Sequence, residues 1–125
     1  MKYLCFGYYN PIAFEKLPRA ELDELVQKCR AHDAALHDSG HLLAVGSLAA
    51  PAAAKSVRPR NGKPLVTDGP FAEAKEVIGA FFIIEARDEQ EAVDIASRHP
   101  AAHLGEHVGW GVEVRAIDFM QEGAR

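Results

Sequence analysis

The sequence predicts an α+β fold made of two βαβ halves. Short apolar and aromatic runs with the length of β-strands alternate with two segments whose apolar residues recur at helical spacing. Between the halves, an Asn-Gly pair flanked by two short runs is a strong β-hairpin signal. The order βαβ, hairpin, βαβ is typical of a ferredoxin-like sandwich.

The first half contains two predicted strands and one predicted helix. An aromatic and apolar run over residues 2–9 predicts the first strand, which ends before Pro11. Pro18 opens the helix, and Gly40 is placed to stop it. The apolar run over residues 41–50 predicts the second strand.

The hairpin is predicted over residues 56–67, around the turn Asn61-Gly62. Pro59 and Pro64 cannot donate a backbone hydrogen bond to a neighbouring strand, so we expect the hairpin to lie at a sheet edge. Charged side chains protect such an edge from pairing with other chains, and anion binding is the alternative role for them. The basic residues of the hairpin are Lys55, Arg58, Arg60 and Lys63.

The second half repeats the pattern of the first. Residues 77–86 form the most hydrophobic predicted strand. Asp88 and Glu91 resemble a capping box at the start of a helix that ends before Pro100. Residues 108–119 predict the last strand.

Length and composition indicate one globular domain. We assign residues 1–120 to a single domain and residues 121–125 to a flexible C-terminal tail. The apolar fraction of 48% and the charged fraction of 26% are typical of soluble proteins. The net charge of −4 argues against nucleic-acid and anionic-membrane partners, because both require a positive field.

The expected location is the cytoplasm. The N-terminus lacks the pattern of a secretory signal peptide, and no apolar stretch approaches the length of a bilayer. Cys5 and Cys29 lie among apolar neighbours, which fits buried free thiols in a reducing compartment.

Both faces of the predicted sheet are apolar. In the first strand, Leu4 and Phe6 lie on one face and Tyr3 and Cys5 on the other, and the third strand repeats this pattern. Two helices cover only one face, and a face left open to water should carry polar residues. We therefore expect a homodimer whose sheets pack face to face, with a ligand pocket in any cleft between them.

Residues 62–86 closely resemble the YCII-related family, in particular its DGPF branch. The hallmark is Asp68-Gly69-Pro70-Phe71, with Ala72-Glu73 and Lys75-Glu76 after it, and the resemblance extends over nearly the whole chain. It implies the dimeric α+β barrel, a ferredoxin-like fold.

The resemblance also suggests two kinds of function. Most members of the branch have no assigned reaction, and some are similar to products of genes next to, or fused to, extracytoplasmic-function sigma factors. Wider relatives include a dehydrochlorinase that acts on a chlorinated hydroxyquinol. In these relatives a His on the first helix and an Asp at its end resemble a catalytic dyad. The resemblance places the Asp at Asp38 and puts Cys29 at the His position, and His32, one turn later, is the candidate to replace the histidine.

Asp68 is the best single candidate for a functional group. Pro70 fixes its own φ and pushes Gly69 out of the α region, which leaves the Asp68 carboxylate little freedom. If residues 70–76 form a helical turn, Asp68 is placed to cap it. The residue either makes an ordinary turn or lines the intersubunit cleft as a general base or ligand contact.

Two groups of three histidines have alternative interpretations. His32, His37 and His41 surround the end of the first predicted helix, where they either complement the helix dipole or serve acid–base chemistry near neutral pH. His37 and Asp38 are adjacent, and we do not expect them to pair.

The second group has a regular spacing of four residues, which on one helix would suggest a metal-binding face. Proline and glycine residues interrupt it, so loop histidines are the favoured interpretation, and we expect neither a metal site nor a cofactor. The group consists of His99, His103 and His107.

The sequence favours a small-ligand-binding protein, with a sensing or sigma-factor-associated regulatory role. The alternative is a cofactor-independent lyase or isomerase in which Asp68 and a histidine such as His32 transfer protons. The expected partners are a second copy of the chain, an unknown small molecule and a protein of a sigma-factor pathway. An aromatic dimer core would account for the same aromatic residues as a ligand pocket. The candidate pocket residues are Phe6, Tyr8, His41, Phe71 and Phe81.

Overall fold

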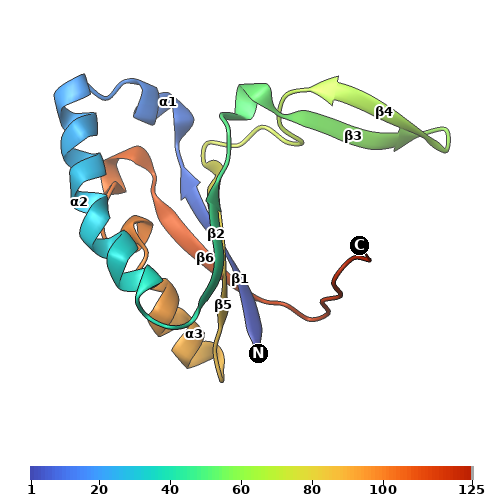
Figure 1. The fold of residues 1–125 in the computed structure, drawn as a ribbon. Helices are drawn as coiled ribbons and strands as arrows, with labels where there is room; N and C mark the ends of the chain where they lie inside the picture. Colours follow the sequence, from blue (N-terminus) through green and yellow to red (C-terminus); the bar gives the residue numbers. More distant parts are fainter. Residues whose placement is uncertain (125) are drawn as a thin grey trace.

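The protein is an α+β structure in which helices cover one face of an antiparallel sheet (Figure 1). A computed structural model describes residues 1–124. The α+β prediction is confirmed. The elements, in chain order, are β1 (Lys2–Tyr9), α1 (Pro11–Glu15), α2 (Arg19–His37), β2 (Leu42–Ser47), η1 (Pro51–Ala53), β3 (Lys55–Arg60), β4 (Lys63–Asp68), β5 (Val77–Glu85), α3 (Glu89–Ala96), η2 (Pro100–Ala102), η3 (Glu106–Val108) and β6 (Gly111–Ala116).

The four-stranded sheet has the order β2-β5-β1-β6, and every neighbouring pair is antiparallel. Strands β1 and β2 of the first half therefore run in the same direction with β5 between them. Strands β5 and β6 of the second half likewise enclose β1. Each βαβ unit is thus split by a strand of the other half, so neither half forms a continuous sheet alone.

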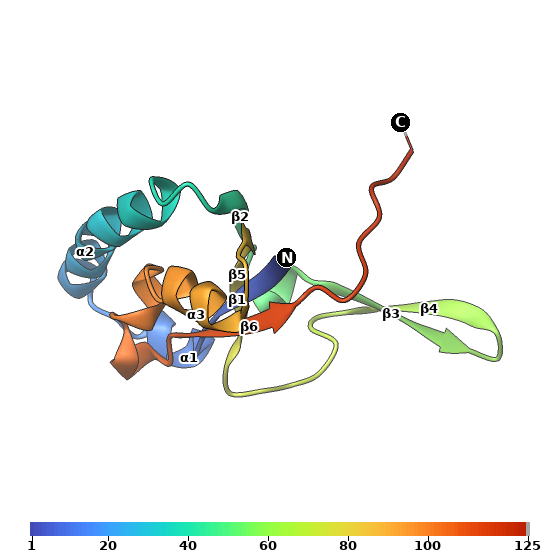
Figure 2. The same cartoon turned by 90° about the horizontal axis from the view of Figure 1, so that it is seen from below.

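The hydrophobic core lies between the sheet and the helix layer, which both views place on the same side of the sheet (Figures 1 and 2). Tyr3 pairs with Ile84 and Cys5 pairs with Phe82, which brings the large side chains of β1 and β5 together on the helix-facing side. Burial of this apolar surface is the main stabilising term. The buried residues of the cluster are Tyr3, Cys5, Leu36, Phe82, Ile84, Ala86, Ala92, Ile95 and Ala96.

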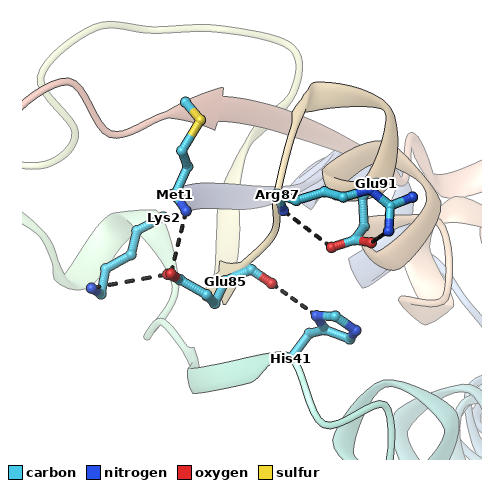
Figure 3. Close-up of polar contacts among 6 residues, drawn as sticks. All are labelled: Met1, Lys2, His41, Glu85, Arg87 and Glu91. Atoms are coloured by element: carbon cyan, nitrogen blue, oxygen red, sulfur yellow. Dashed lines mark hydrogen bonds and ion pairs between the residues drawn. The ribbon is translucent and has the colours of Figure 1, made fainter.

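Two helix starts are fixed by side-chain caps. The Asp88 carboxylate accepts a hydrogen bond from the backbone N–H of Glu91 at 2.9 Å, which confirms the predicted start of α3. Glu91 in turn accepts from the backbone N–H of Arg87 (Figure 3). Helix α1 was not expected from the sequence. Asn10, which follows the predicted first strand, caps this short helix by accepting from the backbone N–H groups of Ile12 and Ala13.

The hairpin does not lie at an edge of the main sheet, although both of its strands are edge strands of their own small sheet. Strands β3 and β4 form a separate two-stranded sheet that projects on the side of the main sheet opposite the helices (Figures 1 and 2). Residues 48–54 connect β2 to the hairpin and residues 69–76 connect the hairpin to β5, and both segments lie outside the two sheets. The turn itself is as predicted, since Asn61 and Gly62 have positive φ values of 52° and 77°.

The last strand is shorter than the predicted range of residues 108–119. The 3-10 helix η3 occupies residues 106–108, and Gly109 follows in the left-handed region with φ 73°. Strand β6 therefore starts at Gly111 and ends at Ala116. Of the predicted tail, residues 121–124 have no regular secondary structure, and Arg125 lies outside the described residues.

The face of the sheet opposite the helices is apolar, as the sequence predicts. Leu4 pairs with Ile83 and Phe6 pairs with Phe81, and all four side chains remain partly accessible. Polar groups lie at the margins of this face: Lys2 pairs with Glu85 at one end of β1 and β5, and on the β6 side the Tyr8 hydroxyl donates to Glu113 at 3.0 Å. We call this surface the open face.

None of the helices within residues 1–124 combines the length and the apolar character needed to cross a bilayer.

Candidate functional site

A cavity of about 650 Å³ lies between the helix layer and the sheet, at the end where β1 finishes and β5 begins. Its volume is in the range of small-molecule sites. Helices α1 and α2, the 3-10 helices η1 and η2 and the strand ends all contribute to its wall. The lining residues are Gly7, Tyr8, Tyr9, Pro11, Phe14, Glu15, Cys29, Asp33, Ser47, Leu48, Ala50, Pro51, Ala52, Gly79, Ala80, His99, Pro100, Ala101 and Trp110.

The cavity exists because side chains become small along the helix-facing side of the sheet. In β5, Ile84 and Phe82 are fully buried, and Ala80 follows at the next position on that face. In β1 the same change occurs after Cys5, where Gly7 lies opposite Ala80. Large side chains fill the layer at one end of the sheet, and alanine and glycine leave it empty at the other.

Two glycines hold the aromatic walls in place. A Cβ atom built on Gly79 would lie 2.7 Å from the ring of Tyr9, so only glycine permits this approach. Gly105, with φ 71°, lies against the ring of Trp110 and would collide with it if it carried a side chain. Tyr9 also packs edge-on against Phe14, with ring centroids 5.7 Å apart. The walls are therefore rigid, apolar and aromatic.

His99 is the most strongly positioned polar group of the cavity. Its ring stacks on Phe82 with a centroid distance of 4.9 Å and an interplanar angle of 3°. Its Nδ1 atom accepts a hydrogen bond from the backbone N–H of Ala101 at 3.0 Å, which caps η2. Burial lowers the pKa of His99, and the carboxylate of Asp33 opposes this shift in part. His99 is therefore held as a neutral imidazole whose proton lies on Nε2.

Cys29 and Asp33 reach the cavity from one face of α2, four residues apart. Burial, followed by the negative charge of Asp33, raises the pKa of the Cys29 thiol. The charged residues that line the cavity are Glu15 and Asp33, and none of the lysine and arginine residues within residues 1–124 lines it. The cavity is thus apolar with a negative electrostatic bias.

The structure places Asp68 outside this cavity. Its side chain is 85% exposed and pairs with Lys55 across the hairpin. Residues 70–76 contain no helix, so Asp68 has no helical turn to cap. Gly69, with φ 96°, turns the chain back instead, and its carbonyl oxygen accepts from the Ser56 hydroxyl at 2.8 Å. The hallmark turn therefore closes the base of the hairpin.

His32 and Asp38 lie apart from Asp68 and from each other. The ring of His32 stacks on His103 with a centroid distance of 4.8 Å. Asp38 follows the last residue of α2 and contacts His37, Nδ1 to Oδ1, at 3.2 Å. The expectation that His37 and Asp38 do not pair is therefore wrong, because Asp38 lies beyond the end of the helix, although both side chains are exposed.

Of the predicted pocket residues, Tyr8 borders the cavity, although its hydroxyl bonds to Glu113 on the open face. Phe6 and Phe81 lie on the open face. Phe71 is 61% exposed in the loop after the hairpin, where the Arg58 guanidinium lies 3.8 Å from its ring centroid. His41 lies just before β2, and its Nδ1 contacts the carbonyl oxygen of Glu85 at 2.9 Å (Figure 3).

The histidines with a spacing of four residues do not converge. His99 caps η2, the Nε2 atom of His103 contacts the carbonyl oxygen of Ser97, and His107 belongs to η3. Within residues 1–124, no group of three histidine, cysteine, aspartate or glutamate side chains is arranged to hold a metal ion.

Most residues of the cavity were not identified as site residues from the sequence. The spacing of Cys29 and Asp33 on one helix face was available as a signal. His99 and Trp110 come from segments that lie next to α2 only after folding, so no local pattern could reveal them.

Comparison with known proteins finds a matching family and a relative of similar sequence. The family described as "YCII-related domain" matches residues 1–117. An uncharacterized protein of Rhizobium meliloti (strain 1021) is 39% identical over 59 residues, which are 47% of this chain and 48% of that protein. The aligned region thus spans about half the length of the relative.

The two thiols should differ in reactivity. Because the thiolate is the reactive form, Cys5, fully buried and with its pKa raised to about 12, should not react with 5,5′-dithiobis(2-nitrobenzoate) in the folded protein at pH 8. Cys29, partly accessible from the cavity, should react slowly. Cys29→Ala should abolish the native reaction and Cys5→Ala should preserve it; rapid labelling of both thiols would contradict this arrangement.

His99 should make folding stability depend on pH. Its pKa in the folded protein is lower than the ordinary 6.5, so below about pH 6.5 the unfolded chain takes up a proton that the folded chain excludes. The free energy of unfolding should therefore fall as the pH drops from 7 to 5, and less so in His99→Asn, which retains a capping oxygen. Urea unfolding at each pH measures this, with His107→Asn as the control for loss of an exposed imidazole. Parallel pH profiles for wild type and His99→Asn would refute the assignment.

Proposed function

Since the chain belongs to the YCII-related family, we propose that it is a small-molecule-binding protein whose ligand occupies the cavity between α2 and the sheet. The observation that carries this proposal is the cavity of about 650 Å³ with aromatic walls. Ligand sites of proteins are typically concave, largely apolar and fixed in shape, with a few polar groups that orient the ligand.

Two features indicate that the cavity is a specific feature of the fold and not a packing defect. Its position coincides with the change from large to small side chains on both central strands. Two of its aromatic rings pack so closely against glycine residues that a Cβ atom at the glycine position would collide with the ring. A packing defect would have neither feature, because core side chains normally fill such a layer to high density.

The regulatory role suggested by the resemblance to the DGPF branch fits a binding protein. A ligand that fills a cavity bounded by α2 and η2 would stabilise the packing of these elements, and a cytoplasmic sensor could report this change to a protein of a sigma-factor pathway. The alternative of proton transfer by Asp68 and His32 stays a prediction, since within one chain the two residues lie in different parts of the fold.

A homodimer of ferredoxin-like subunits is part of the proposal. The strand order with both βαβ units split is the arrangement expected for a ferredoxin-like sheet. The open face presents Leu4, Phe6, Phe81 and Ile83, and a second copy of the same face is the partner with matching chemistry. The dimeric α+β barrel would result from this face-to-face packing.

The hairpin supports the same assembly. It projects past the open face, and its paired valines Val57 and Val66 are 56% and 61% exposed (Figure 1). Phe119, in the segment after β6, is 80% exposed, and this C-terminal segment runs on the same side of the sheet as the hairpin (Figure 1). If a second subunit packs on the open face, these exposed apolar side chains would pack against it and become buried.

The cavity should lose its ligand-binding capacity when it is filled. Ala80→Leu adds three carbon atoms to the cavity floor and should weaken binding of the neutral fluorescent probe N-phenyl-1-naphthylamine at least about tenfold. Ala31→Leu, the same change on the exposed surface of α2, should leave the affinity unchanged. If wild type does not bind the probe, or Ala80→Leu binds it equally well, the proposed site is wrong.

The dimer is tested by a charge on the open face. Wild type should elute with twice the 13.6 kDa mass of one chain in size-exclusion chromatography with light scattering. Ile83→Glu should shift the mass to that of one chain, because a buried carboxylate without a partner is costly. Val26→Glu, on the outer surface of α2, should remain dimeric. A wild-type protein that remains monomeric at high concentration would exclude the assembly.

A further inference from the structure

The polar groups of the cavity restrict what it can bind. The Nδ1 atom of His99 is occupied by the backbone N–H of Ala101, so the imidazole proton lies on Nε2. Among residues 1–124, none accepts a hydrogen bond from Nε2, and the atom is not sealed off from solvent. The ring thus offers one hydrogen-bond donor that the protein itself does not use.

The donor is fixed in position. Stacking on Phe82 holds one face of the ring, and Gly7 lies beside it: a Cβ atom built on Gly7 would be in ordinary van der Waals contact, 3.7 Å, with Cε1 of His99. The bond to Ala101 fixes the rotation of the ring about its own axis. A fixed donor in an apolar environment discriminates strongly between ligands, because little orientational entropy remains to be lost on binding.

The charges of the cavity discriminate further. Glu15 and Asp33 are its charged lining residues, and neither forms an ion pair with a described residue. Among the described lining residues, a carboxylate or phosphate ligand would meet two negative charges and no cation that offsets the desolvation cost of its own charge. An uncharged ligand meets no such penalty, and a cationic ligand gains from Asp33.

We propose, on the premise that the cavity is the ligand site, that it selects uncharged or cationic ring compounds with a carbonyl-type acceptor, and that the acceptor bonds to Nε2–H of His99. The aromatic walls Tyr9, Phe14 and Trp110 pack against the ring of the ligand. Asp33 and Glu15, both solvent-exposed where they line the cavity, disfavour organic acids and phosphorylated metabolites. His99 is the residue that determines specificity.

Three naphthyl probes of nearly equal shape test the hydrogen bond from His99 and the discrimination against anions. They are 2-acetylnaphthalene, which has the acceptor; 2-isopropenylnaphthalene, in which a methylene group replaces the oxygen; and 2-naphthoate, which is an anion. In calorimetric titrations, wild type should bind the ketone about tenfold more tightly than the hydrocarbon, and the carboxylate least tightly.

Two substitutions separate the contributions. His99→Asn retains a capping oxygen but has no donor at the Nε2 position, so it should bind the ketone and the hydrocarbon equally. Asp33→Asn, on the exposed part of α2, should bind 2-naphthoate more tightly than wild type does and leave the ketone affinity within about twofold. His107→Asn should keep the wild-type order.

The outcomes distinguish the two proposals. If wild type binds the ketone and the hydrocarbon equally, or His99→Asn retains the difference between them, the role of His99 is refuted while the cavity remains a binding site. If 2-naphthoate binds as tightly as the ketone, the exclusion of anions is refuted. If none of the three naphthyl compounds and no N-phenyl-1-naphthylamine binds, the proposed function and this inference fail together.

Discussion

The gradient of side-chain size along the helix-facing side of β1 and β5 is the constraint on which the rest of the structure depends. At one end Tyr3, Phe82 and Ile84 fill the layer under α3 and anchor the fold. At the other end Gly7 and Ala80 leave space under α2. Because the same two central strands carry both regions, the packed end supplies the rigidity that keeps the other end open. An isolated cavity without this anchor would collapse to recover lost dispersion contacts.

The sheet thereby separates two tasks on its two faces. The helix-facing side holds the core and the cavity, and the open face carries the apolar surface proposed for the second subunit. The Asp68-Gly69 turn belongs to neither. It closes the base of the hairpin through Lys55 and Ser56, so the segment that most resembles the family has a structural role within one chain. The polar contacts around Glu85 fix the opposite end of the sheet, where β1 starts (Figure 3).

The sequence was sufficient for the elements whose signals are local. The Asn61-Gly62 turn, the Asp88 cap and the alternating apolar strands each act through neighbouring residues, and all three are present. The position of the hairpin relative to the main sheet could not be predicted. Two prolines indicate that a strand does not lie inside a sheet, but they do not indicate which sheet edge or surface it joins. The cavity could not be predicted, because Cys29, His99 and Trp110 meet only through the packing of α2 against the η2 region. The sequence patterns indicated Asp68 and His32 as site residues because their side chains are reactive. The cavity, in contrast, is formed by glycine and alanine residues, which carry no such signal.

The most direct measurement is a crystal structure of the wild-type protein under xenon pressure, since xenon enters preformed apolar cavities without specific contacts. The size gradient predicts electron density for xenon between Tyr9, Phe14, Trp110 and Ala80, with α2 in the same position with and without the gas. A structure in which α2 packs directly on Ala80, with no space for xenon, would contradict the account.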